Sequence, residues 1–99
     1  MYTKALANGS HAAGRYTVAK QPYQYVIGKY NADNANATFI IGNGTDVADD
    51  KRSNLFEVGG NNNTEPYIKL NNVTITETQL SKLLTLLNNL ESYGVLVNS

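Results

Sequence analysis

The chain has 99 residues, with eight basic and eight acidic side chains, one histidine and no cysteine, so its formal net charge at pH 7 is zero. This length suits one small domain, and a neutral chain has no net attraction for nucleic acid or anionic membranes. The lack of cysteine excludes disulfides, a single histidine argues against a metal cluster, and no apolar run reaches the roughly 18–20 residues of a membrane span. We therefore expect no cofactor, no nucleic-acid partner and no membrane insertion.

Residues 1–45 contain a repeat that predicts stacked β-strands. Gly14, Gly28 and Gly42 recur every 14 residues, and they close the pentads SHAAG, QYVIG and TFIIG. A fixed short period is typical of a solenoid, in which each repeat packs on the next. A fourth pentad, LFEVG, follows after 17 residues. We interpret the extra residues, which fall within 46–52, as a loop that protrudes from the stack.

The columns of the repeat predict strands with two apolar faces. Residues one and three places before each glycine point to the same side of a strand. They are Ala13 and His11, Ile27 and Tyr25, Ile41 and Phe39, and Val58 and Phe56. The column between them holds Ala12, Val26, Ile40 and Glu57. A strand that is buried on both faces needs a partner on each, either a further strand layer or another chain. We expect the Val26 and Ile40 column to be buried between chains.

Glycine and asparagine predict the corners between rungs. Glycine adopts positive φ without steric penalty, and asparagine is the next most tolerant residue. The asparagines at the expected corners are Asn8, Asn31, Asn34, Asn36 and Asn43.

Residues 46–76 predict a loop followed by a small antiparallel region. Segments 55–58 and 67–70 have strand character, and the sequence GGNNN after the first of them is typical of a turn. Residues 73–75 form a further short strand candidate.

Residues 77–99 predict a helix and a tail. Thr76 and Gln79 have the spacing of a capping box, and Gly94 is placed to end the helix. Leucines then follow at the a/d spacing of a coiled coil, at Leu80, Leu83, Leu87 and Leu90. Two heptads are too few for an autonomous coiled coil. The helix therefore either packs on its own domain or bundles with neighbouring chains.

Three groups of residues have chemistry that a site would need, and each also has a structural explanation. His11 forms no recognised motif with a serine or a carboxylate, which favours a packed structural residue. Oxygen-bearing side chains at 43–50 lack the spacing of a calcium loop. This favours a solvated acidic loop whose negative charge is balanced by Lys51 and Arg52. Tyrosines offer a stacking surface for sugar; the candidates are Tyr16, Tyr23, Tyr25 and Tyr30, of which Tyr25 belongs to the predicted core.

The pentads and their spacing resemble the head repeats of YadA-like trimeric adhesins and related repeats of phage fibre proteins. The matching segments are SHAAG, YVIGKYN and FIIGNGT, and the run FIIGNGTDVADDKRSNLFEV resembles the segment that follows such repeats in prophage structural proteins. The resemblance covers about residues 8–72. It implies a left-handed parallel β-roll in each chain, three chains about a threefold axis, and a fibre or spike that binds a receptor. The repeat is short and no anchor barrel follows it, so we expect a fragment or a terminal module of a longer fibre.

The expected fold is thus mainly β: a short left-handed parallel β-roll with 14-residue rungs over residues 1–45, a loop and antiparallel region over 46–76, and one C-terminal helix with a tail over 77–99, assembled as a homotrimer. The expected structural and interface residues are Gly14, Gly28, Gly42, Tyr25, Val26, Ile27, Phe39, Ile40, Ile41, Leu80, Leu83, Leu87 and Leu90.

The expected function is that of a non-enzymatic module of a trimeric phage or prophage fibre, which contributes to trimerisation and host-surface attachment. Its location would be the virion or a bacterial cell surface. The expected partners are copies of itself, a host-surface glycan, or other fibre proteins. A head fragment of a bacterial trimeric adhesin is the alternative. A tailspike-type glycan depolymerase is less favoured, because the glutamates show no paired spacing.

Overall fold

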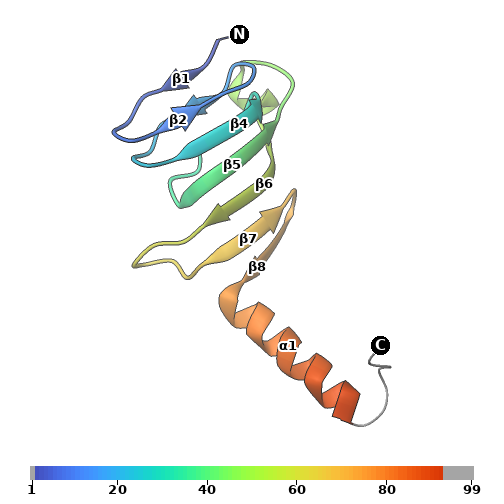
Figure 1. The fold of residues 1–99 in the computed structure, drawn as a ribbon. Helices are drawn as coiled ribbons and strands as arrows, with labels where there is room; N and C mark the ends of the chain where they lie inside the picture. The colour runs from blue at the N-terminus through green and yellow to red at the C-terminus, as the bar shows by residue number, and fades with distance from the viewer. Residues whose placement is uncertain (1, 93–99) are drawn as a thin grey trace.

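The computed structural model of the chain describes residues 2–92, which form a mainly β structure with one C-terminal helix (Figure 1). The expected fold class is confirmed at this level. The large sheet has the strand order β2-β4-β5-β6-β7-β8, and β1 and β3 form a small second sheet. The elements are β1 (Lys4–Ala5), β2 (His11–Ala12), β3 (Val18–Ala19), β4 (Tyr25–Lys29), β5 (Ala37–Asn43), a 3-10 turn (Asp49–Lys51), β6 (Asn54–Gly59), β7 (Tyr67–Leu70), β8 (Val73–Thr76) and α1 (Glu77–Ser92).

The 14-residue period sets the register of the parallel strands. His11 of β2 lies opposite Tyr25 of β4, and Tyr25 lies opposite Phe39 of β5. The small sheet has the same offset, because Lys4 of β1 lies opposite Val18 of β3. Residues that share a place in the repeat therefore become neighbours in space.

Gly14 and Gly28 are required by both conformation and space. Their φ values are 108° and 97°, a region that L-residues with a side chain rarely adopt. A Cβ at Gly14 would collide with the carbonyl oxygen of Gly28, and a Cβ at Gly28 would collide with that of Gly42. The glycine column thus lets consecutive rungs approach closely.

None of the five asparagines at the expected corners has positive φ, and four of them make side-chain hydrogen bonds instead. Among the described non-glycine residues, positive φ occurs at Tyr16, Tyr23, Tyr30 and Asn71. Asn31, one of the expected corner residues, is instead buried, and its Oδ1 accepts a hydrogen bond from the N–H of Val18 at 2.7 Å. Its Nδ2 donates to the carbonyl of Val18 at 3.0 Å. This amide therefore ties β3 to the following rung.

The fourth pentad does not continue the parallel stack. β6 runs antiparallel to β5, with Glu57 opposite Ile40, and β7 and β8 continue the antiparallel pairing. The interpretation of this pentad as a further rung is wrong, whereas the expected antiparallel region is confirmed. A period-two pattern reads the same in both chain directions, so the columns of side chains gave no sign of the reversal.

The core lies between the two sheets and within a single chain. It consists of Ala19, Val26, Ala37 and Ile40, and Val26 and Ile40 have no exposed surface. The expectation that the Val26 and Ile40 column is buried between chains is therefore wrong. Its partner layer belongs to the same chain and includes β3, which contacts β4 and contributes Ala19 to the cluster.

Glu57 occupies the next place in this inward column and is also buried. Its carboxylate accepts hydrogen bonds from the side-chain amides of Asn34 and Asn54 and lies 3.5 Å from the Tyr67 hydroxyl. Burial, followed by the negative charge of Glu57, raises the pKa of Tyr67 above its ordinary value of 10.0. The apolar core thus passes into a polar cluster where the sheet becomes antiparallel.

Candidate assembly surface

The side of the large sheet that faces away from β1 and β3 carries two continuous rows of side chains, which are apolar except for His11 at the end of the first row. Directly paired residues in neighbouring strands point to the same face, so the registers define each row. The first row is His11, Tyr25, Phe39, Val58, Ile68 and Ile75. The second row is Ile27, Ile41, Phe56, Leu70 and Val73. We call these two rows the outer face.

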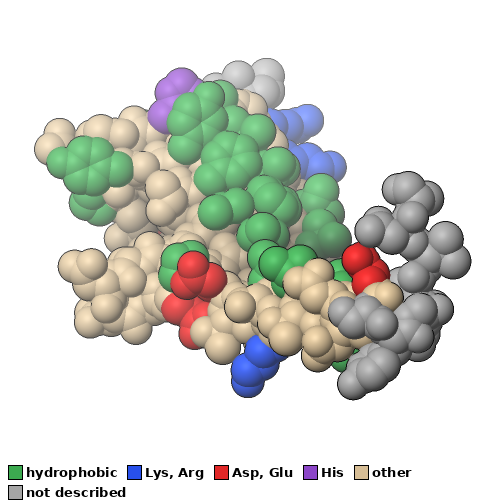
Figure 2. Space-filling model, turned by 60° about the horizontal axis from the view of Figure 1, so that its bottom comes forward, with side chains coloured by type: hydrophobic (Ala, Val, Ile, Leu, Met, Phe, Trp, Pro, Cys, Tyr) green, Lys and Arg blue, Asp and Glu red, His purple; other side chains and the backbone are tan. Residues whose placement is uncertain are grey.

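The outer face is uncovered in the single chain. Leu70 and Val73 are 59% and 69% exposed, and Tyr25, Val58 and Ile68 are between 37% and 45% exposed. Figure 2 shows hydrophobic side chains gathered into one broad band on the molecule. Apolar patches of this kind on a small protein mark interaction sites.

Aromatic rings on the outer face pack against one another. The rings of His11 and Tyr25 stack with centroids 4.4 Å apart, and those of Tyr25 and Phe39 stack at 5.8 Å. Phe56 meets Phe39 edge to face at 6.3 Å. His11 is thus a stacking residue at the end of the first row, in agreement with its structural interpretation.

The predicted capping box begins α1. The Thr76 hydroxyl accepts a hydrogen bond from the Gln79 N–H at 3.2 Å, and the Gln79 side chain accepts one from the Thr76 N–H at 3.0 Å. Glu65 adds an acceptor for the Thr78 N–H at 2.8 Å. Hydrogen bonds from the N–H and then the hydroxyl of Thr78 hold the pKa of Glu65 below its ordinary value of 4.5. The helix start is therefore well determined.

The body of α1 extends away from the sheets and contacts β8, the strand that precedes it (Figure 1). The a/d leucines Leu80, Leu83 and Leu87 are 38–49% exposed, and Leu90 is half-buried. Packing of the helix on its own domain is not observed in the described part of the chain. The expected helix end at Gly94 and the apolar tail after it lie outside the described residues.

The structure gives the expected structural and interface residues of the sheet three different places. Val26 and Ile40 are core residues, and the three glycines of the repeat space the rungs. Tyr25, Ile27, Phe39 and Ile41, which were expected in the buried columns, lie on the outer face. The outer face also includes four residues of the last two strands that were not expected at an interface, namely Ile68, Leu70, Val73 and Ile75. The alternation of apolar and polar residues over 67–76 was the available signal.

Within residues 2–92 no three histidine or acidic side chains converge on a point that would hold a metal ion, and no helix has the length and hydrophobicity needed to cross a bilayer. The chain matched no protein-family model, no curated protein and no solved structure when it was compared with them.

Proposed function

We propose that this protein is a non-enzymatic structural module of a trimeric fibre, of the phage or prophage type, in which three copies assemble through the outer face and the leucine stripe of α1. Residues 1–45 of each copy would form a short left-handed parallel β-roll. The fibre would be carried on a virion and would contribute to attachment to a cell surface. The observation that carries the proposal is the pair of uninterrupted apolar rows that a single chain leaves exposed.

The energetics favour covering this surface. Full burial of a leucine or isoleucine side chain contributes about 1.5–3 kcal/mol, so covering the exposed half of each such residue contributes about 1 kcal/mol. The outer face has ten apolar side chains in each chain, of which five are 37–69% exposed and five are already partly buried. The sum is roughly 5–10 kcal/mol per chain, which is comparable to the cost of association.

The helix supports the same proposal independently. α1 has 16 residues and few tertiary contacts, and isolated helices of about this length are marginal in water. An a/d leucine stripe is complementary to copies of itself, which selects further copies of this chain as the occupant. Because the sheet face and the helix stripe belong to one elongated molecule of 54 × 29 × 24 Å, one assembly can cover both along its length.

The test is the mass of the chain in solution, measured by light scattering after size exclusion. We expect three times the chain mass of 10.8 kDa, and a dissociation that follows dilution. A monomer at all accessible concentrations would overturn the proposal.

A further inference from the structure

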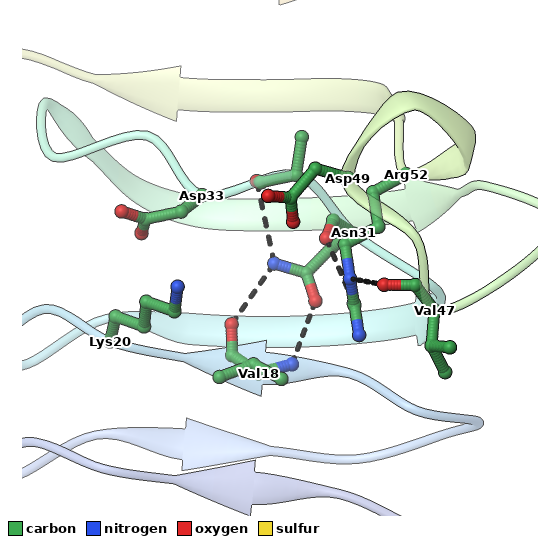
Figure 3. Close-up of a pocket in the computed structure, with 8 residues that line it drawn as sticks. Val18, Lys20, Asn31, Asp33, Val47, Asp49 and Arg52 are labelled. Atoms are coloured by element: carbon green, nitrogen blue, oxygen red, sulfur yellow. Dashed lines mark hydrogen bonds between the residues drawn. The ribbon is translucent and has the colours of Figure 1, made fainter.

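A groove lies between the small sheet and the loop over residues 44–53, on the opposite side of the molecule from the outer face. Its main part has a volume of about 410 Å³ and is lined by residues such as Lys20, Asp33, Asp49 and Arg52 (Figure 3). A neighbouring hollow of about 240 Å³, lined by Tyr2 and others, shares three lining residues with the first. We call the two together the loop groove. Its size lies in the range of roughly 300–1,000 Å³ that small-ligand sites occupy.

Arg52 builds the wall of the loop groove. Its Nη1 donates to the carbonyls of Tyr16 and Asn31 at 3.0 and 3.2 Å, and its Nε donates to the carbonyl of Val47 at 3.1 Å. The guanidinium thus fastens the loop to two rungs. The sequence had suggested that Arg52 would pair with the loop carboxylates, but its side-chain hydrogen bonds to the described residues all go to backbone carbonyls. This anchoring holds Val47 and Asp49 over the groove without the help of a ligand.

Three charged side chains remain available at the wider end. Lys20 and Asp33 line one side of the cavity, and Asp49 lies beside Arg52 (Figure 3). Asp33 accepts a hydrogen bond from the Gln21 side chain at 3.2 Å. The ammonium of Lys20 and the carboxylate of Asp49 make no side-chain hydrogen bond to any described residue, and both residues are exposed. This end therefore offers both hydrogen-bond donors and acceptors.

The narrower end is aromatic. The rings of Tyr2 and Tyr16 stack with centroids 5.8 Å apart and an interplanar angle of 3°, and Tyr30 continues the stack at 5.3 Å. Lys4 lies over the Tyr2 ring at 5.2 Å. The 14-residue repeat places these tyrosines one above another, and the outermost, Tyr2, is 59% exposed.

We propose that the loop groove binds a carbohydrate. A ligand that fits must offer hydroxyl groups that donate to carboxylates and accept from an ammonium, together with an apolar surface for tyrosine and valine. The lining of the loop groove has three basic residues, Lys4, Lys20 and Arg52, and two acidic ones, Asp33 and Asp49, so charge alone selects an ionic ligand only weakly. The carboxylates of Asp33 and Asp49 oppose the phosphates of a nucleic acid. The proposal rests on the attachment role of the proposed function and names the ligand class of that role.

The test is a titration of the isotopically labelled chain with simple sugars, followed by the backbone amide signals in NMR spectra. The probes are methyl glucoside, methyl galactoside, N-acetylglucosamine and N-acetylneuraminic acid, each taken into the millimolar range. We expect shifts at the loop groove, near Val18, Lys20, Asp33 and Asp49, with at least one probe. Saturable shifts confined to these residues support the site.

A matched pair of variants tests the chemistry. Asp49→Asn and Asp50→Asn make the same change at adjacent residues of the 3-10 turn, but only Asp49 lines the groove. Loss of a hydrogen bond to a charged group corresponds to about a tenfold weaker affinity or more, expected for Asp49→Asn alone. Both variants should retain the native amide spectrum elsewhere. Equal weakening by the two variants, or no shift with any probe, would overturn the proposal.

The outcome separates this site from the assembly. If sugar shifts the amide signals at the groove and the protein is monomeric by mass, the carbohydrate site is supported and the trimer is refuted. A trimer that shows no response at the groove would retain the assembly and remove the carbohydrate site.

Discussion

Ile68→Asp places a charge in the centre of the outer face and should dissociate the trimer. Ile68 stands in the first row between Val58 and Ile75 and is 42% exposed in the single chain. The chain itself should still fold, because the side chain is not part of the core. The poor strand propensity of aspartate and the lost burial of the covered half of the side chain together cost the single chain about 2 kcal/mol.

The effect on assembly is larger. In the trimer the substitution removes about 1 kcal/mol of apolar burial and adds the cost of an unpaired, partly buried carboxylate, which together come to about 3 kcal/mol per chain. Three chains make this about 9 kcal/mol per trimer, or about six powers of ten in the association constant. Because the midpoint concentration of a monomer–trimer equilibrium follows the square root of that constant, it should rise about a thousandfold.

Sedimentation equilibrium over a dilution series measures this midpoint, and circular dichroism confirms that the chain remains folded. Leu6→Asp is the control, since Leu6 is 61% exposed but lies next to β1, outside the outer face. A folded Ile68→Asp protein that dissociates at the wild-type concentration would refute the reasoning. Equal dissociation of the Leu6→Asp protein would refute it as well.

Three further predictions concern the single chain. Ile40→Ala should lower the free energy of unfolding by about 2–4 kcal/mol, because the side chain is fully buried; urea denaturation measures this, and the exposed Thr38→Ala is the control. Thr76→Ala removes the acceptor for the Gln79 N–H and should destabilise α1 by about 1 kcal/mol, seen as lost helical ellipticity on heating; an unchanged melt would contradict the capping role. The raised pKa of Tyr67 predicts a stabilising effect that is complete below pH 10 or so and is lost as pH rises through the folded-state value. The free energy of unfolding of the wild-type protein should fall between about pH 9 and 12 by more than that of Tyr67→Phe. Identical pH profiles of the two proteins would be evidence against this role of Tyr67.

Local structure at the start of the chain and at the beginning of α1 follows from short sequence patterns alone. Glycines at a period of 14 predicted which residues stack, and the observed registers of β2, β4 and β5 have that offset. The capping box and the start of α1 followed from Thr76 and Gln79. These features depend on neighbours along the chain or on a fixed spacing, which a sequence displays directly.

Tertiary structure decided which apolar column is covered and by what. Val26 and Tyr25 stand in adjacent columns that are both apolar in the sequence, but β3 packs over only one of them, so Val26 is core and Tyr25 is on the outer face. It also decided the direction of β6, since alternation is unchanged when a strand is reversed. The loop groove depends on Arg52 reaching carbonyls of two earlier rungs, 36 and 21 residues away in the chain. The hydrophobicity of a side chain predicts that it is buried, whereas contacts between distant segments determine which layer covers it.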